Sequence, residues 1–145
     1  MKKLLMALAM TATMAVSGVC AAAGEGNILN KDQKAAEALL AGLNGNEMAT
    51  YATATAGMVP ELKAKVTEEA YNNLKKNVKE KLGSCKESVF RTFDHFHDGD
   101  RLVYVGKYTK EENVVMFFVF NPAGKIMNFS LSPVKPQQQA QQPAK

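Results

Sequence analysis

The chain has 145 residues, of which 46% are hydrophobic and 22% charged, and this length accommodates one compact domain rather than two. Its 10 Gly, 5 Pro and 2 Cys exclude a collagen-like repeat and a disulfide-rich miniprotein, and the hydrophobic fraction argues against disorder throughout. The formal net charge of +4 falls to +2, from 16 basic and 14 acidic residues, once the N-terminal segment described next is removed. Charge therefore gives no reason to expect nucleic acid or an anionic membrane as a partner.

Residues 1–23 have the order of a secretory signal peptide. Lys2 and Lys3 are followed by an apolar run and then by small residues. The run is shorter than the roughly 20 residues that a transmembrane helix needs. We therefore expect cleavage after Ala21 or Ala23, a mature protein that is periplasmic or extracellular, and no transmembrane span after the leader is removed.

Two cysteines bear on the compartment. Cys20 raises lipoprotein anchoring as the alternative, but Val19 and Ser17 stand where such a signal normally has a small and a branched apolar residue. Loss of the leader leaves Cys85 alone, and a single thiol forms no internal disulfide in an oxidising compartment. The fold must therefore be stable through its core.

Residues 24–132 are expected to form one α+β domain, because a helical half precedes a strand half and the two do not interleave. Apolar residues recur at three- and four-residue steps in the first half, and cap residues flank the clearest segments. Three helices are predicted, beginning near Asn30, over residues 46–56, and between Thr67 and Gly83.

From Ser88 onward the apolar period changes to the alternation of a strand. Four strands are predicted, over residues 88–97, 100–109, 113–121 and 125–132. Their connections are too short for crossovers, which predicts a four-stranded antiparallel meander with the helices packed on it. Two-residue turns are expected at Asp98-Gly99, Glu111-Glu112 and Pro122-Ala123. Residues 133–145 are rich in Pro and Gln, and we expect a disordered tail.

If all three turns are two-residue loops, the pairing assigns every strand residue to a face of the sheet. One face, expected to be mostly core, carries Phe90, Thr92, Asp94, Phe96, Val103, Val105, Lys107, Met116, Phe118, Phe120, Met127, Phe129 and Leu131. The other face carries Val89, Arg91, Phe93, His95, Leu102, Tyr104, Tyr108, Val115, Phe117, Val119, Ile126, Asn128 and Ser130. Three helices cover one face only, so the second would leave a large apolar patch in water.

Two arrangements would cover the second face. In the first, a homodimer packs the sheet on its two-fold copy. In the second, the helices cover this mixed face and enclose a pocket for a small hydrophobic or peptide ligand. The residues predicted for ligand binding or for the interface are Arg91, Phe93, His95, Tyr104, Tyr108, Phe117 and Asn128.

Three segments carry a resemblance to a known family: AAEALLAGLNGNEMATY from the first helix onward, NVKEKLGSCKES at the end of the third, and VVMFFVFNPAGKIMNFSLSP over the last two strands. With the order of the elements, they resemble the nuclear transport factor 2-like, cystatin-like cone superfamily, most closely its short uncharacterised domains in secreted bacterial proteins. The resemblance implies a cone-like sheet wrapped on helices, frequent dimerisation and often an internal cavity, but it implies no activity.

The densest titratable cluster is the segment FDHFHDGD, residues 93–100. His95 and His97 are two apart in a predicted strand, so both rings project from one side, but a third ligand of restricted geometry is missing and no metal is expected. Asp94 or His95 inside a cavity would suit proton transfer, as in isomerases and dehydratases of the broader superfamily. No family motif matches either residue, so no catalytic residue and no cofactor are assigned.

Lys75, Lys76, Lys79 and Lys81 crowd the end of the third predicted helix, where cations favour the negative end of the helix dipole. Acidic residues lie close by, and no aromatic residues alternate with the lysines. We therefore expect a solvated helix face rather than an anion site.

The sequence predicts a secreted or periplasmic, non-catalytic domain that binds a small hydrophobic or peptide ligand, or a second copy of itself. The alternative is a small cavity-based proton-transfer enzyme. A closed cavity with Asp94 or His95 at its base would distinguish the enzyme from the binding domain.

Overall fold

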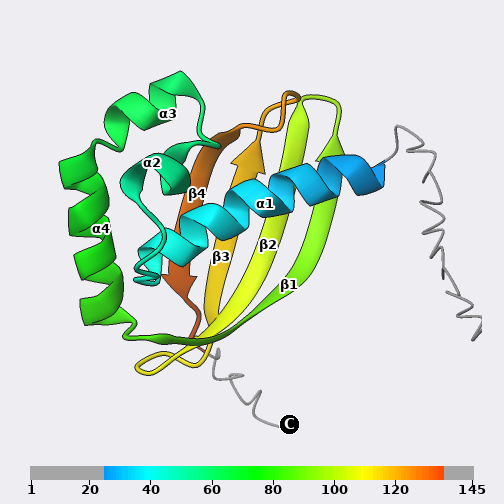
Figure 1. The fold of residues 1–145 in the computed structure, drawn as a ribbon. Helices are drawn as coiled ribbons and strands as arrows, with labels where there is room; N and C mark the ends of the chain where they lie inside the picture. Colours follow the sequence, from blue (N-terminus) through cyan, green and yellow to red (C-terminus); the bar gives the residue numbers. More distant parts are fainter. Residues whose placement is uncertain (1–24, 136–145) are drawn as a thin grey trace, which may run out of the picture.

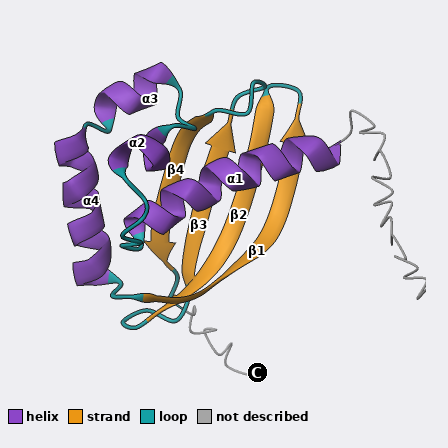
Figure 2. Cartoon of the chain, in the orientation of Figure 1, coloured by secondary structure: helices purple, strands orange, loops and turns teal. Residues whose placement is uncertain are grey.

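The chain folds into four helices and one four-stranded sheet within residues 25–135, the part that the computed structural model describes. The helices are α1 (Glu25–Leu43), α2 (Tyr51–Thr55), α3 (Pro60–Lys65) and α4 (Glu68–Lys81). The strands are β1 (Cys85–Phe96), β2 (Gly99–Tyr108), β3 (Val114–Phe120) and β4 (Ile126–Pro133). The fold is α+β, as predicted (Figures 1 and 2). The predicted leader, residues 1–23, and residues 136–145 of the predicted tail lie outside the described residues.

The sheet is an open antiparallel meander with the strand order β1-β2-β3-β4, which confirms the predicted topology. α1 lies diagonally across one face, while α2, α3 and α4 gather toward the β4 side (Figure 1). Backbone bonds from Val59 N to Ile126 O (3.0 Å) and from Ile126 N to Gly57 O (2.7 Å) join the α2-α3 connection to the start of β4. No helix within residues 25–135 is long and apolar enough to cross a membrane.

The helices follow local chemistry with two differences from prediction. The Thr67 hydroxyl accepts a hydrogen bond from Ala70 N at 3.2 Å and caps α4 as expected. α1 extends further toward the N-terminus than the predicted start near Asn30, because Leu29 packs against the core and prolongs the apolar stripe. α3 was not predicted, and its Pro60 occupies the first turn, where the missing N–H is tolerated. Three helices were predicted, whereas the described residues form four.

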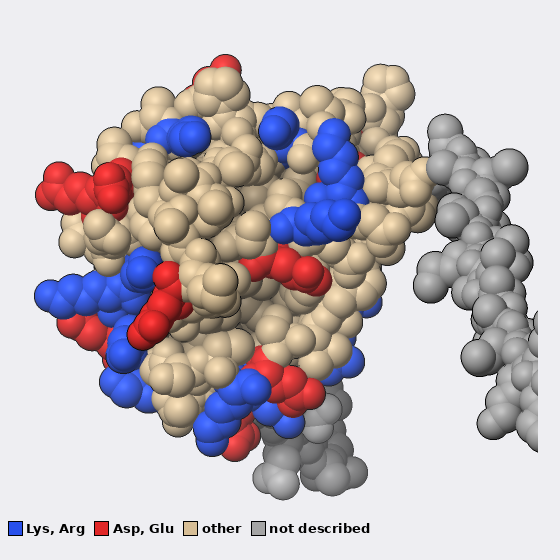
Figure 3. Space-filling model, in the orientation of Figure 1, with Lys and Arg blue, Asp and Glu red and all other residues tan. Residues whose placement is uncertain are grey.

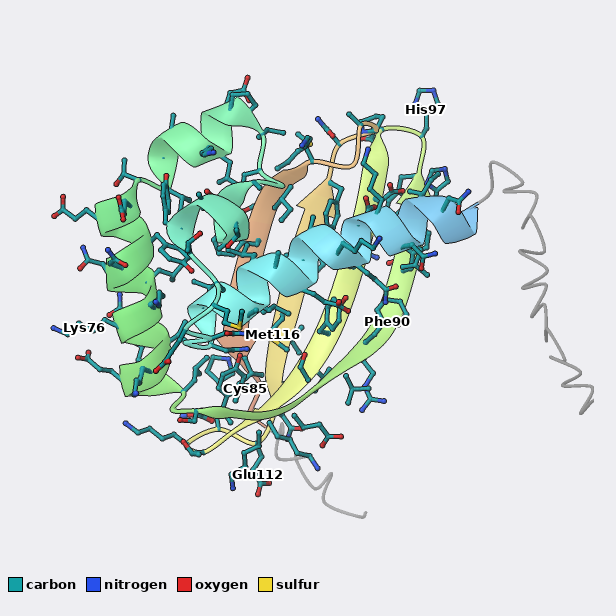
Figure 4. All side chains as sticks on the ribbon, in the orientation of Figure 1. Lys76, Cys85, Phe90, His97, Glu112 and Met116 are labelled. Atoms are coloured by element: carbon teal, nitrogen blue, oxygen red, sulfur yellow. The ribbon has the colours of Figure 1, made fainter. Side chains whose placement is uncertain are left out.

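The core lies between α1 and the sheet. The buried side chains of α1 share one helical face and include Ala36, Leu39, Leu40 and Leu43. They belong to one cluster with buried side chains of the two central strands, Leu102, Tyr104, Tyr108, Val114, Met116, Phe118 and Phe120. Figure 4 shows Met116 in this layer, beside α1. The Tyr108 hydroxyl also donates to Asn44 Oδ1 at 2.8 Å, which ties β2 to the end of α1.

The predicted faces of β3 are confirmed, with Met116, Phe118 and Phe120 in the core, whereas those of β2 are reversed because the β2-β3 connection is longer than two residues. Residues 109–113 link the strands, and Val105 pairs with Val115. A register shift by an odd number of residues changes which faces of two paired strands coincide. The prediction of Val103 and Val105 as core residues is therefore wrong, and Tyr104 of the same strand is buried instead.

β1 changes face part-way along its length. A bulge follows Phe90, so Phe90 pairs with Tyr104 on the helix side, whereas Thr92 lies on the other side. A second irregularity, beside Phe120, brings Ile126 into the core rather than onto the predicted opposite face. Bulges leave little trace in an alternating sequence pattern, which is why the predicted faces mixed residues of both sides.

Two neighbouring phenylalanines test this assignment. Phe118 is fully buried beneath α1, whereas Phe117 is half-buried on the opposite face. We expect Phe118→Ala to lower the free energy of unfolding by roughly 3–5 kcal/mol, because it opens a cavity in the core, and Phe117→Ala to lower it by about 1 kcal/mol. Urea denaturation at low protein concentration, followed by circular dichroism, measures both. A larger loss for Phe117→Ala would contradict the observed faces.

Candidate functional site

The face of the sheet that α1 leaves open is apolar along its two central strands. Its half-buried side chains, which we call the open-face strip, are Val89, Val103, Val105, Val115, Phe117 and Val119. In β3 these residues alternate with buried ones, so the whole strand, VVMFFVF, is apolar on both sides. Asn128, Ser130 and Ser132 border the strip on β4. Strands that are apolar on both faces are typical of sheets covered on both faces.

An arginine with two aromatic neighbours stands at one end of the open-face strip. Arg101 Nη2 donates a hydrogen bond to Asp94 Oδ2 at 2.6 Å. The Arg101 guanidinium carbon lies 5.4 Å from the ring centroid of Phe96 and 5.6 Å from that of Phe117. Phe96 is 47% exposed. The cluster holds a charged, planar group against exposed aromatic surface, a combination that is common in binding sites.

The structure separates the residues predicted for ligand binding. On the helix side lie Phe93, His95, Tyr104 and Tyr108. Arg91 is the extra residue of the β1 bulge and is exposed. Phe117 and Asn128 lie on the open face. The predicted set is therefore divided between two sides of the sheet and lines no common pocket.

The two histidines have different surroundings. His95 Nδ1 is hydrogen-bonded to Asp100 Oδ1, and the His95 side chain is 43% exposed. His97 lies at the tip of the β1-β2 hairpin and points away from the fold (Figure 4). No group of three or more His, Cys, Asp and Glu side chains within residues 25–135 is arranged to hold a metal ion. Asp94, the other candidate for proton transfer, lies on the opposite face of the sheet from His95.

Behind His95 lies a carboxyl pair that the sequence analysis missed. Asp100 is 3% exposed and Asp32, on α1, is 0% exposed. Burial first, and then the hydrogen bond to Asp100 and its charge, raise the pKa of Asp32 to about 7. The available signal was the position of Asp32 four residues before Ala36, on the apolar stripe of the helix, where a solvated carboxylate is out of place.

A groove of about 740 Å³ lies between the end of α1 and α4 and is lined in part by Lys75, Lys76 and Lys79. Lys75 Nζ lies 5.6 Å from the ring centroid of Tyr71, and Lys76 Nζ lies 3.9 Å from Glu80 Oε1. Figure 3 shows acidic side chains among the basic ones along this side of the molecule. The lysines form a solvated, internally compensated helix face.

Cys85 is the free cysteine of the described residues and stands half-buried at the start of β1 (Figure 4). Its Sγ donates a weak hydrogen bond to Glu87 O at 3.6 Å. Burial raises the pKa of the thiol. His95 lies roughly 30 Å away along the same extended strand, so it does not activate the sulfur.

Comparisons with protein-family models, with curated proteins and with solved structures gave no match for this chain. Among the features of the described residues, the open-face strip is the apolar surface that α1 leaves uncovered.

The Cys85 thiol is expected to react slowly near neutral pH. At pH 7.5 its reaction with a chromogenic disulfide reagent should be roughly tenfold slower than that of a free thiol, because the thiolate is the nucleophile and burial disfavours it. The rate should increase as the pH is raised past the ordinary thiol pKa of 9.0, and unfolding in urea should remove the difference. A rate at pH 7.5 equal to that of the free thiol would show an activated cysteine instead.

Proposed function

We propose that this chain is a non-catalytic interaction domain that self-associates through the open-face strip. One observation carries the proposal: β3 has apolar side chains on both faces, and α1 covers only one of them (Figure 1). Covering apolar surface contributes about 25 cal/mol for each Å² removed from water, and extended exposed patches mark interaction sites. The open face therefore favours a bound state over a solvated one.

A second copy of the chain fits the charge distribution around the strip. Asp94 and Arg101 stand at one end, and Glu87 and Lys107 at the other, with 3.8 Å between Glu87 Oε2 and Lys107 Nζ. Each end thus carries one residue of each sign. A copy related by a two-fold axis meets no net like charge in either direction, and antiparallel sheets pack face to face through apolar inner surfaces.

The Arg101 cluster supplies the anchor of the proposed interface. Arginine and aromatic residues are enriched among the few side chains that carry most of the binding free energy at interfaces. Phe117 lies within the strip, and Phe96 extends the apolar surface beside it. Contacts around this anchor exclude water, and the polar residues of β4 form part of the rim.

The proposal includes membership of the nuclear transport factor 2-like cone superfamily and export by the leader. Its support is the order of helices before a meander, α1 lying across one face of the sheet, and the signal-like residues 1–23. The resemblance implies frequent dimerisation, which agrees with an open apolar face. A small hydrophobic or peptide ligand on the same strip is the competing occupant, and the experiment below separates it from a second copy.

Sedimentation velocity of the purified protein tests self-association. We expect a dimer at micromolar concentration, and we expect Phe117→Asp to weaken the dimer by about 100-fold, because it places a charge in the apolar interface. Met48→Asp is the matched control, since Met48 is 89% exposed and lies on a loop away from the sheet. Circular dichroism confirms that each variant is folded.

Four outcomes decide between the occupants. A wild-type dimer that Phe117→Asp dissociates and Met48→Asp leaves intact supports the second copy. A wild-type monomer whose open face binds an apolar dye, with binding lost in Phe117→Asp, replaces the second copy by a hydrophobic ligand. A monomer that binds no dye, or a dimer that Phe117→Asp leaves intact, overturns the proposal.

A further inference from the structure

A pair of buried carboxyl groups joins the N-terminal half of α1 to the sheet. Asp32 on α1 is 0% exposed, and Asp100 at the start of β2 is 3% exposed. Neither Asp32 oxygen accepts a hydrogen bond from an N–H or O–H group of the described residues, and the group within hydrogen-bonding reach is the Asp100 carboxyl. Ionised carboxylates have acceptors only, so a hydrogen bond between these two requires a proton on one of them.

The β3-β4 turn closes over Asp32 without offering it a donor. A Cβ atom at Gly124 would lie 3.0 Å from Asp32 Oδ1, so the turn packs directly against the carboxyl. Gly124 N donates to Asn121 O, and Ala123 N donates to Asn121 Oδ1. Lys31 Nζ reaches over the turn to donate to Ala123 O at 2.6 Å. The nearby amide and ammonium groups are therefore engaged elsewhere.

We propose that Asp32 and Asp100 bind one proton between them, and that this proton docks the N-terminal half of α1 on the sheet, so that docking loosens as the pH rises. Without the proton, two buried carboxylates face each other; Asp100 is hydrogen-bonded to His95 Nδ1, but no donor of the described residues compensates Asp32, and like charges in a buried site repel. Withdrawal of Asp32 into water relieves the repulsion and lifts the first turns of α1. Leu39 and Leu43, further along the helix, keep the remainder packed.

The groups facing Asp32 set the pH range. They are Asp100 from β2, Lys31 from α1 and His95 from β1, while Gly124 of the β3-β4 turn adds no charge. Burial and Asp100 raise the pKa of Asp32 from 3.8 to about 7, whereas Lys31 and His95 act to lower it. Between these two values the folded protein binds more protons than the unfolded chain. The free energy of unfolding is therefore greatest below pH 3.8, falls as the pH rises from 3.8 to about 7, and levels off above about 7.

Urea unfolding from pH 5 to 8, combined with hydrogen exchange of α1, tests the proposal. For the wild-type protein, the unfolding equilibrium constant should increase by up to about tenfold per pH unit between pH 5 and 7, and the first turns of α1 should lose protection. Asp32→Asn keeps the shape and supplies an amide donor to Asp100, so it should flatten this dependence. Asp100→Asn supplies an amide donor to Asp32 in place of the shared proton, and it is the second test variant if Asp32→Asn does not fold.

Two controls assign the proton. Asp94→Asn changes a carboxyl that is paired with Arg101 on the open face, and it should keep the wild-type slope between pH 5 and 7. His95→Asn removes the imidazole that is hydrogen-bonded to Asp100, and it should also keep most of the slope. A flat wild-type profile, a slope that persists in both Asp32→Asn and Asp100→Asn, or a slope lost in His95→Asn alone overturns the proposal. The pair lies on the helix side, so this result is independent of self-association through the open face.

Discussion

One long helix packs on a sheet whose central strands are apolar on both faces, and the main features of the molecule follow from this imbalance. The side chains of α1, together with buried side chains of α2 and α4, cover one face of β2 and β3, including Met116 and Phe118. The short helices gather toward β4, and the α2-α3 connection is joined to the start of that strand. The opposite face retains Phe117 and its valine neighbours, which are half-buried. Covering that face requires something outside the folded part of the chain described here.

The same apolar layer raises the free-energy cost of ionising the polar groups buried in it. A carboxyl among apolar side chains is expensive to ionise, which is the main reason that the pKa of Asp32 is raised. Burial likewise raises the pKa of Tyr104 to about 12. The buried face of α1 therefore has two parts. The apolar end packs in the same way at every pH, whereas the packing of the end near Asp32 and Asp100 depends on a proton. The two proposals concern opposite sides of the sheet and different forces.

Much of the fold was predictable because its signals are local. Thr67 caps α4 through its own hydroxyl, and the alternation of apolar residues located all four strands to within a few positions. The register was not predictable in the same way. The β2-β3 connection is longer than its acidic residues suggested, and the bulge after Phe90 moves half of β1 to the other face. The helix α3 was not predicted because proline both interrupts helices and begins them, and Pro60 begins this one.

The amino-acid pattern alone determined the α+β class, the order of helices before strands and the antiparallel meander, since periodicity, caps and short connections act within a few residues of one another. Only the tertiary structure decided which side of the sheet is buried and which residues meet. Val103 and Val105 became open-face residues, and Tyr104 a core residue, through loop length and pairing, which no single segment encodes. Asp32 and Asp100 are far apart in the chain, and they form a pair because packing α1 on the sheet buries Asp32 beside Asp100 with no N–H or O–H donor of the described residues for its own oxygens.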